Sequence, residues 1–381
     1  MFHQKKKTPA AGPAPHAAAV TDLAPCEKGL RLNVPPEAVQ PVRAGVMAEF
    51  QKRAQLPGFR KGKAPADAVE RHYANAIRDE TLHRAMQQAF QQAVKDHGLK
   101  PVGPFEVRAA DFTDAGGLTL EAAVEVEPAF ALAAYKGIPL ARGPADVAPR
   151  EVDDAIQSLR RSLTQLAPDK EGGDKEPQAP PVDDELAKDL GFPDLNALRA
   201  HLDAKLREQK RTAQAQALEA ALLDALLKRH AFNVPAKLVA RQADRLARDF
   251  KTRLLLSGMP EAQVEGEAAK FVEQLRTSAA RHVKLGFILD RIAEQERVTI
   301  SQEELVKRLW QVAQRWKKDP AEVRKIFDAQ GLWPSVVGTL RQEKTVAQLL
   351  AAAVIANGTG EPVLARAAAP AAASPTTSPT P

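Results

Sequence analysis

The chain has 381 residues, more than the roughly 250–300 at which a single hydrophobic core stops growing, so two or more domains are expected. A formal net charge of +6 is small for this length and favours an anionic partner bound through a local basic patch. The single cysteine, Cys26, excludes an intrachain disulfide and a cysteine-based zinc site, the eight histidines show no metal-ligand spacing, and we expect no cofactor.

Both ends of the chain have the composition of disordered tails. Residues 1–24 and 359–381 are rich in Pro and Ala, and the second segment adds Ser and Thr. The first segment starts with basic residues but lacks the apolar stretch of a signal peptide. No apolar run in the chain approaches the roughly 18–20 residues of a membrane span. We therefore expect a cytoplasmic protein with no membrane partner.

Residues 25–145 have the pattern of one α+β domain. Alternating apolar residues from Leu30 to Val34 predict a half-buried strand, and a second strand is expected from Leu118 to Val126. Between them, a three-to-four residue spacing predicts two amphipathic helices, the first with Pro41 in its opening turn and the second closed by Gly98. The expected helical stripes are Val39, Val42, Val46 and Phe50, then Val69, Tyr73, Ile77, Leu82, Met86, Phe90 and Val94.

The rest of the chain is predicted to be helical. Residues 146–182 have the pattern of a connecting helix followed by a charged, Pro/Gly-rich linker. Residues 183–358 are predicted to form an irregular, elongated all-α domain, because no fixed-period repeat is present. The expected helix caps are Asp194, Ser301 in a capping box with Glu304, and Asp319 before Pro320.

Three tryptophans stand out in a chain with 5% aromatic residues. Trp310 follows Leu305 and Leu309 on a predicted helix, so we expect it to be packed. Trp316 lies beside two lysines and Trp333 lies in GLWPS, and both are expected to be partly exposed.

The segment PGFRKGKAP, residues 57–65, joins the two helices of the first domain. One interpretation is a solvated connection whose glycines only serve the turn. A second is a phosphate-binding loop of an enzyme, but Gly58 and Gly62 are one residue too close for that motif. Ala64 also stands where the motif needs a magnesium-binding hydroxyl, so this interpretation is disfavoured.

A third interpretation of the loop is a ribonucleoprotein docking site. Arg60, Lys61 and Lys63 are cations suited to phosphates or to a carboxylate of a neighbouring protein. Phe59 at the tip of a charged loop covers no neighbouring core, so a partner is the simplest explanation for it.

The residues GFRKGKAP resemble the signature of the bacterial trigger factor family, chaperones that sit at the ribosomal exit tunnel. The resemblance extends over roughly residues 25–165 and 183–356. It rests on further segments in the same order: RHYANAIRDETLHRAMQQAF, LTLEAAVEVEPAFAL, FNVPAKLVARQADRLARDF, HVKLGFILDRIAEQERVTIS and DPAEVRKIFDAQGLWPSVVGTLRQEKTVAQLL.

The resemblance implies that the loop binds the large ribosomal subunit, through both ribosomal RNA and a ribosomal protein beside the tunnel exit. The residues of this chain that match the family's ribosome-binding motif are Gly58, Phe59, Arg60, Lys61 and Gly62, with Lys63 and Pro65 as flanking members.

The resemblance further implies an ATP-independent chaperone whose helical domain holds unfolded nascent polypeptides, for folding and for protein transport. The sequence does not determine the oligomeric state, so a monomer and a homodimer away from the ribosome both stay open; the family carries a cell-division label. The side chains that contact clients are not identified by the sequence.

Family members normally carry an FKBP-like prolyl isomerase domain between these two parts. Here Val147–Val182 leave room for one helix and a linker, and residues 146–182 contain no Phe, Tyr or Trp to hold a proline. We therefore expect no catalytic residue and no isomerase (rotamase) activity, although the family carries that label. Two alternatives remain at this stage: an RNA- or ribosome-binding regulator that does not hold clients, and an active prolyl isomerase.

Overall fold

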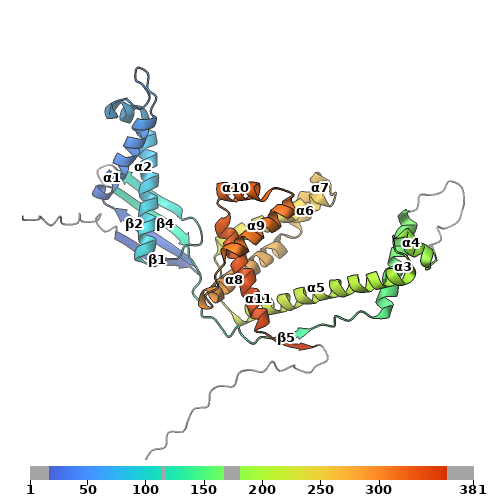
Figure 1. Cartoon of the computed structure of the whole chain (residues 1–381). Coiled ribbons are helices and arrows are strands. Elements are labelled where there is room, and N and C mark those ends of the chain that lie inside the picture. Colours follow the sequence, from blue (N-terminus) through green and yellow to red (C-terminus); the bar gives the residue numbers. More distant parts are fainter. Residues whose placement is uncertain (1–16, 114–116, 167–180, 358–381) are drawn as a thin grey trace, which may run out of the picture. The chain divides into compact units, whose positions relative to one another are not determined.

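The computed structural model describes residues 17–113, 117–166 and 181–357. They form two compact units, one made of the chain up to Ala131 with Ala231–Phe287, the other of Leu132–His230 with the chain from Ile288 onward. Figure 1 shows the elements coloured along the chain. No helix in the described ranges combines the length and apolar character needed to cross a membrane.

A four-stranded antiparallel sheet forms the centre of the N-terminal region, in the order β1-β2-β4-β3. The two predicted strands are its central pair, β2 (Glu27–Val34) and β4 (Gly117–Glu125). Leu32 lies opposite Leu120 in their register, and both side chains are fully buried because alternate residues point to the same face. This confirms the predicted α+β class of this region.

The edge strands β1 (Ala17–Ala24) and β3 (Glu106–Thr113) were not predicted. Residues 17–24 fall in the segment expected to be a disordered tail, and that expectation is wrong for them; residues 1–16 lie outside the described ranges. The physical reason is that edge strands bury few side chains, so alternation is weak. In β3, Phe112 alone is buried, and β1 is held by its antiparallel backbone pairing with β2.

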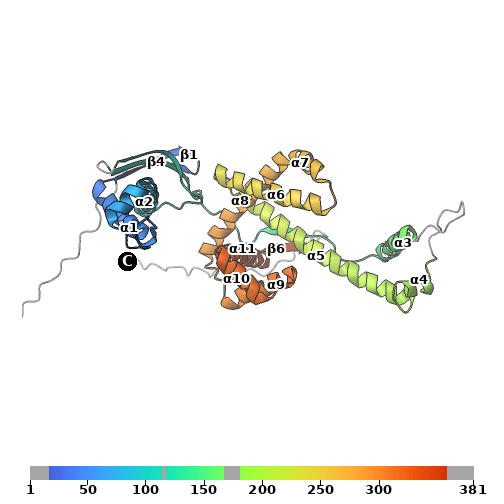
Figure 2. The same cartoon turned by 90° about the horizontal axis from the view of Figure 1, so that it is seen from above.

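Helices α1 (Pro36–Arg53) and α2 (Ala66–Asp96) cover one face of the sheet in both views (Figures 1 and 2). The predicted large residues Leu82, Met86 and Phe90 lie half-buried beside the core. The fully buried residues in this part of α2 each precede one of these large residues or continue their spacing, and they have small side chains. Small side chains fit there because a helix packed closely on a sheet leaves little room at the centre of the interface. Those residues are Thr81, Ala85, Ala89 and Ala93.

Two backbone expectations for these helices had different outcomes. Gly98 has φ +59° and follows α2, and the N–H of Leu99 donates to the carbonyl of Val94 at 2.9 Å, as a left-handed helix cap requires. Pro41 does not lie in the opening turn of α1, because Pro36 already occupies the first helical position. Pro41 is inside the helix, where it removes one backbone donor.

The remainder of the chain is mostly helical, which confirms the predicted class. Asp194, Ser301 with Glu304, and Asp319 all form the expected caps. The helices are α3 (Pro149–Leu166), α4 (Asp184–Asp189), α5 (Leu195–Arg229), α6 (Ala236–Leu256), α7 (Glu261–Ala269), α8 (Val272–Gln295), α9 (Gln302–Trp316), α10 (Pro320–Gln330) and α11 (Trp333–Ala351).

The structure adds a short parallel pair of strands that the all-α description lacks. Strand β5 (Pro139–Arg142) pairs with β6 (Val354–Asn357), with Leu140 opposite Ile355. More than 200 residues of chain separate the two strands in sequence, so no local pattern indicates the pairing. The predicted linker falls on residues 167–180, outside the described ranges.

Candidate functional site

The segment from Ala54 to Pro65 joins α1 to α2 at the tip of their hairpin (Figure 1). Leu56 and Ala64 point inward and belong to a small apolar cluster beneath the loop. The Gln51 side chain reinforces this attachment, since its Nε2 donates to the Ala64 carbonyl at 3.0 Å. The loop is therefore held at both ends by buried side chains. The other buried members of the cluster are Ala54, Val46, Val69 and Ile77.

Backbone hydrogen bonds and two glycines shape the exposed part of the loop. The N–H of Phe59 donates to the Leu56 carbonyl at 3.1 Å, and the N–H of Gly62 donates to the Ala54 carbonyl at 3.3 Å. Gly58 has φ +85° and Gly62 has φ +73°, a backbone region that strongly favours glycine. A Cβ atom at Gly62 would also lie 3.1 Å from the Lys52 carbonyl oxygen, so the loop crosses the end of α1 closely.

The predicted binding residues are presented outward by this frame. The Phe59 side chain is 46% exposed, so it is not part of the core. Arg60, Lys61 and Lys63 are exposed as well, and Pro65 immediately precedes α2. All seven predicted residues lie on the same loop, flanked by the inward-pointing Leu56 and Ala64. The sequence alone indicated the exposed residues and missed these two anchors.

An ion-pair cluster lies behind the loop, between the two helices. Arg84 donates to both carboxylate oxygens of Glu49 at 2.8 Å, and its Nε donates to Glu80 at 2.6 Å. The hydrogen bonds from Arg84 hold the pKa of Glu49 below its usual value, and the carboxylates raise the pKa of Arg84. With Phe50 and Tyr73 these side chains line a hollow of about 300 Å³.

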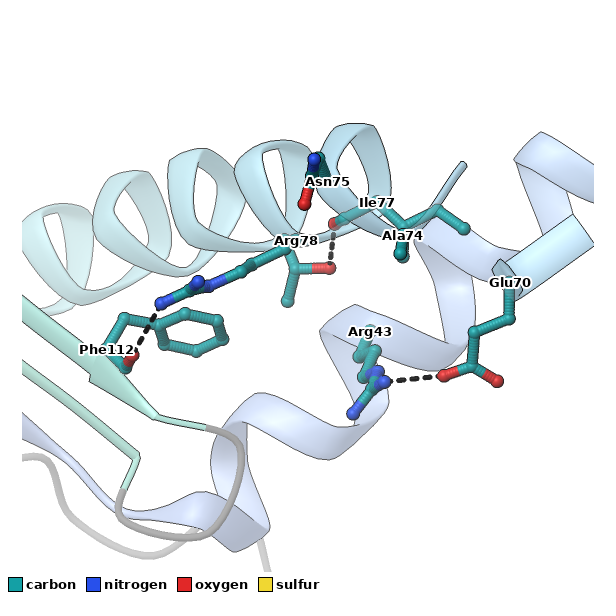
Figure 3. A pocket seen from close by; sticks show the side chains of 8 residues that line it. Arg43, Glu70, Ala74, Asn75, Ile77, Arg78 and Phe112 are labelled. Carbon is teal, nitrogen blue, oxygen red and sulfur yellow. Dashed lines mark hydrogen bonds and ion pairs between the residues drawn. The ribbon is translucent and has the colours of Figure 1, made fainter. Parts of the chain in front are cut away.

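A second hollow, of about 150 Å³, lies deeper in the hairpin beside the sheet (Figure 3). Arg43 donates to Glu70 at 2.6 Å on one side, and Arg78 donates to the Phe112 carbonyl at 3.3 Å on the other. Its hydrogen bonds link the elements that line it, which is the role expected of polar groups at a packing interface. No three His, Cys, Asp or Glu side chains within the described residues could together hold a metal ion.

The loop does not have the geometry of a phosphate-binding loop. It follows helix α1 and not a strand, and the residue after Lys63 is the buried Ala64, which has no hydroxyl.

Exposed large apolar side chains also occur on the helical elements. Leu255 and Leu256 at the end of α6 are 46% and 82% exposed, and Val272 at the start of α8 is 53% exposed. On α9, Val306 and Trp310 lie one turn apart with 44% and 55% exposure. The expectation that Trp310 is packed is therefore wrong.

Trp310 is exposed because the buried side of α9 is rotated by one residue from the expected one. Leu309 and Ala313 form the buried side of α9, and Trp310 lies one residue outside that side. Trp316 is 46% exposed and Trp333 is half-buried, with its Nε1 donating to Asp328 at 2.7 Å, so both are partly exposed as predicted.

Comparison with known proteins gives two family matches in chain order. The model described as bacterial trigger factor protein (TF) matches residues 17–159, and the model of the bacterial trigger factor protein C-terminus matches residues 194–351. The chain belongs to the trigger factor family. No match to an FKBP-type isomerase domain is found, and residues 160–193 lie outside both matched models.

Similar relatives are the trigger factors of two Anaeromyxobacter strains. That of strain Fw109-5 is 26% identical over 423 aligned positions, covering 88% of this trigger factor and 98% of the relative. That of Anaeromyxobacter dehalogenans strain 2CP-C is 24% identical, covering 88% and 99%. Because the first alignment is longer than the 381 residues of this chain, the relative has residues without a counterpart here.

Among solved structures, one from work on promiscuous substrate recognition in folding and assembly by the trigger factor chaperone is 18% identical. It covers 87% of this chain and 99% of its own, with a TM-score of 0.48.

Proposed function

We propose that this trigger factor is an ATP-independent cytoplasmic chaperone that docks at the exit tunnel of the large ribosomal subunit and holds nascent polypeptides. The observation that carries the proposal is the loop, on which an exposed Phe59 is followed by exposed Arg60 and Lys61. The proposed docking residues are Gly58, Phe59, Arg60, Lys61, Gly62, Lys63 and Pro65.

The chemistry of the loop suits a ribonucleoprotein. Its cations attract the negatively charged ribosome over several ångströms and accelerate encounter, an effect that salt screens. The ring of Phe59 adds apolar burial in the complex, which salt does not screen. Leu56 and Ala64 hold the loop in place beforehand, so little ordering entropy is lost on binding.

The docking proposal is tested by the triple variant Phe59→Ala, Arg60→Ala and Lys61→Ala. Ribosome co-sedimentation should be lost while circular dichroism stays unchanged, because all three side chains are exposed and the loop anchors are untouched. A matched control is Trp316→Ala with Lys317→Ala and Lys318→Ala, which removes an equally exposed aromatic ring and two cations from α9 and its end. Persistent co-sedimentation of the loop variant would place docking elsewhere.

The proposal for client holding rests on the exposed apolar side chains of the helices. Leu256, Val272 and Trp310 are each more than half exposed, and they lie in small groups on different helices and not in one continuous patch along the chain. Such scattered apolar surface binds unfolded segments weakly and reversibly without self-association. Tethering at the tunnel exit compensates by raising the local client concentration. A regulator that acted through the loop alone would have no use for this surface.

We further propose that this chain does not catalyse prolyl isomerisation. Support comes from the chain around the gap between the two family matches, where α3 and α4 pack on the start of α5. The aromatic residues needed to hold a proline are lacking from residues 146–182. The proposed partners are the ribosome and unfolded nascent chains.

A further inference from the structure

Some cations of the α1–α2 hairpin are held in ion pairs and others are not. Arg84 lies in an ion pair with two carboxylates, Glu49 and Glu80. By contrast, the cations at the tip have no carboxylate within ion-pair distance among the described residues, and their side chains are exposed. Those tip cations are Lys52 and Arg53 in the last turn of α1, and Arg60, Lys61 and Lys63 in the loop.

The sequence leaves these five cations without local compensation. No acidic residue occurs between Glu49 and Asp67. Lys52 and Arg53 act electrostatically on Glu49, but both oxygens of that carboxylate already accept hydrogen bonds from Arg84. The tip is therefore a region of net positive charge.

Backbone contacts place Lys52 and Arg53 beside the loop. The N–H of Gly62 donates to the carbonyl of Ala54, the residue after Arg53, at 3.3 Å. A Cβ atom added at Gly62 would lie 3.1 Å from the carbonyl oxygen of Lys52, so the loop backbone passes close to the last turn of α1. The last turn of α1 and the loop thus form one continuous surface and not two separate ones.

A simpler role for Lys52 and Arg53 is to balance the negative end of the α1 dipole. Lys95 has that same position in the last turn of α2, at the far end of the hairpin from the loop. The dipole explains one cation in each helix equally well. It does not explain why the tip adds four more unpaired cations within twelve residues of Lys52.

We propose that Lys52 and Arg53, together with Lys63, form a contact surface for the phosphate backbone of RNA that adjoins the Phe59 tip. This inference rests on the proposed ribosome docking and adds residues outside the GFRKG motif to it. RNA is favoured over an acidic protein because its backbone offers a regularly repeated negative charge, which suits a continuous row of cations better than a single carboxylate. Phe59 remains the apolar part of the contact.

The test is the salt dependence of ribosome binding by the double variant Lys52→Gln and Arg53→Gln. Each lost phosphate contact should reduce the slope of log K against log salt by about 0.7–0.9, so the double variant should lose about 1.4–1.8. Lys95→Gln is the matched control, because it removes a last-turn cation with the same dipole role but should leave the slope unchanged. Phe59→Ala should lower affinity at every salt concentration and also leave the slope unchanged.

Two outcomes would overturn the inference without touching the proposed function. One is an unchanged slope in the double variant while the loop triple variant still fails to co-sediment. The other is a reduced slope on ribosomes but not on protein-free large-subunit RNA, which would assign the two cations to an acidic ribosomal protein. Continued co-sedimentation of the loop triple variant would instead remove the docking proposal itself.

Discussion

Gly58 and Gly62 both have left-handed backbone conformations, but their surroundings differ. Space around Gly58 is open, since a Cβ there would meet no atom within 4 Å. At Gly62 the same added atom would lie 3.1 Å from a backbone carbonyl that cannot easily move, because it belongs to α1. The first glycine is needed for its backbone conformation alone, and the second for conformation and close approach.

We predict that Gly62→Ala lowers the free energy of unfolding more than Gly58→Ala. The left-handed conformation alone should cost about 1 kcal/mol at Gly58, and the added contact should bring Gly62 to about 2 kcal/mol. Urea unfolding of both variants measures the difference. Equal losses would mean that the end of α1 adjusts freely, and that the loop is less firmly attached to it than the contacts indicate.

Helix ends and exposed helix sides determine where clients can be held. Leu255 and Leu256 end α6, and Val272 begins α8, so these exposed side chains lie on either side of α7 in sequence, within a single compact unit. Nearby, Phe250 packs against Phe271 with ring centroids 5.2 Å apart. The aromatic pair joins the end of α6 to the residue before α8, while Leu255 and Leu256 stay exposed.

We predict that Leu256→Ser with Val272→Ser weakens suppression of aggregation of a denatured protein. Burying a leucine contributes about 1.5–3 kcal/mol, so a client segment that covers Leu256 should bind about tenfold more weakly to the variant. Thermal stability should change little, since both side chains are more than half exposed. Leu23→Ser, an exposed leucine on β1, is the control and should leave aggregation suppression unaltered. If the control is equally impaired, the effect is not specific to these helix ends.

At the scale of the whole molecule, a small apolar core joins the segment between the two matched parts to the adjoining ends of both matches. Ile156 of α3, Leu186 of α4 and Leu198 of α5 are almost completely buried against one another. These elements therefore close an apolar cluster that spans the gap between the two matched models.

We predict that the purified protein does not accelerate prolyl isomerisation. The uncatalysed reaction takes tens of seconds or more, so a proline-containing peptide followed by stopped-flow should relax at the same rate with and without the protein. An FKBP-type isomerase added to the same peptide is the positive control. A substantial rate increase by this chain alone would show that an isomerase site exists outside the recognised family module.

Several features followed from sequence because they involve neighbours along the chain. The caps at Asp194 and Asp319 bind backbone N–H groups two or three residues away, and Gly98 ends its helix through its own backbone conformation. The loop is another local feature, since its glycines, cations and ring are consecutive residues. The family itself was also evident from these co-linear segments.

Other features were decided by contacts between distant parts of the chain. Strand β1 exists because β2 offers it backbone partners, and β5 pairs with a strand more than 200 residues later. Helix α10 packs against one side of α9 and leaves the other side exposed. This packing determines that Leu309 is buried and Trp310 is exposed. Local sequence determined the ends of helices and the chemistry of the loop, because those interactions span only a few residues. Tertiary structure decided strand pairing, burial and the anchoring of the loop by Leu56 and Ala64, because these depend on which distant segments exclude water from one another.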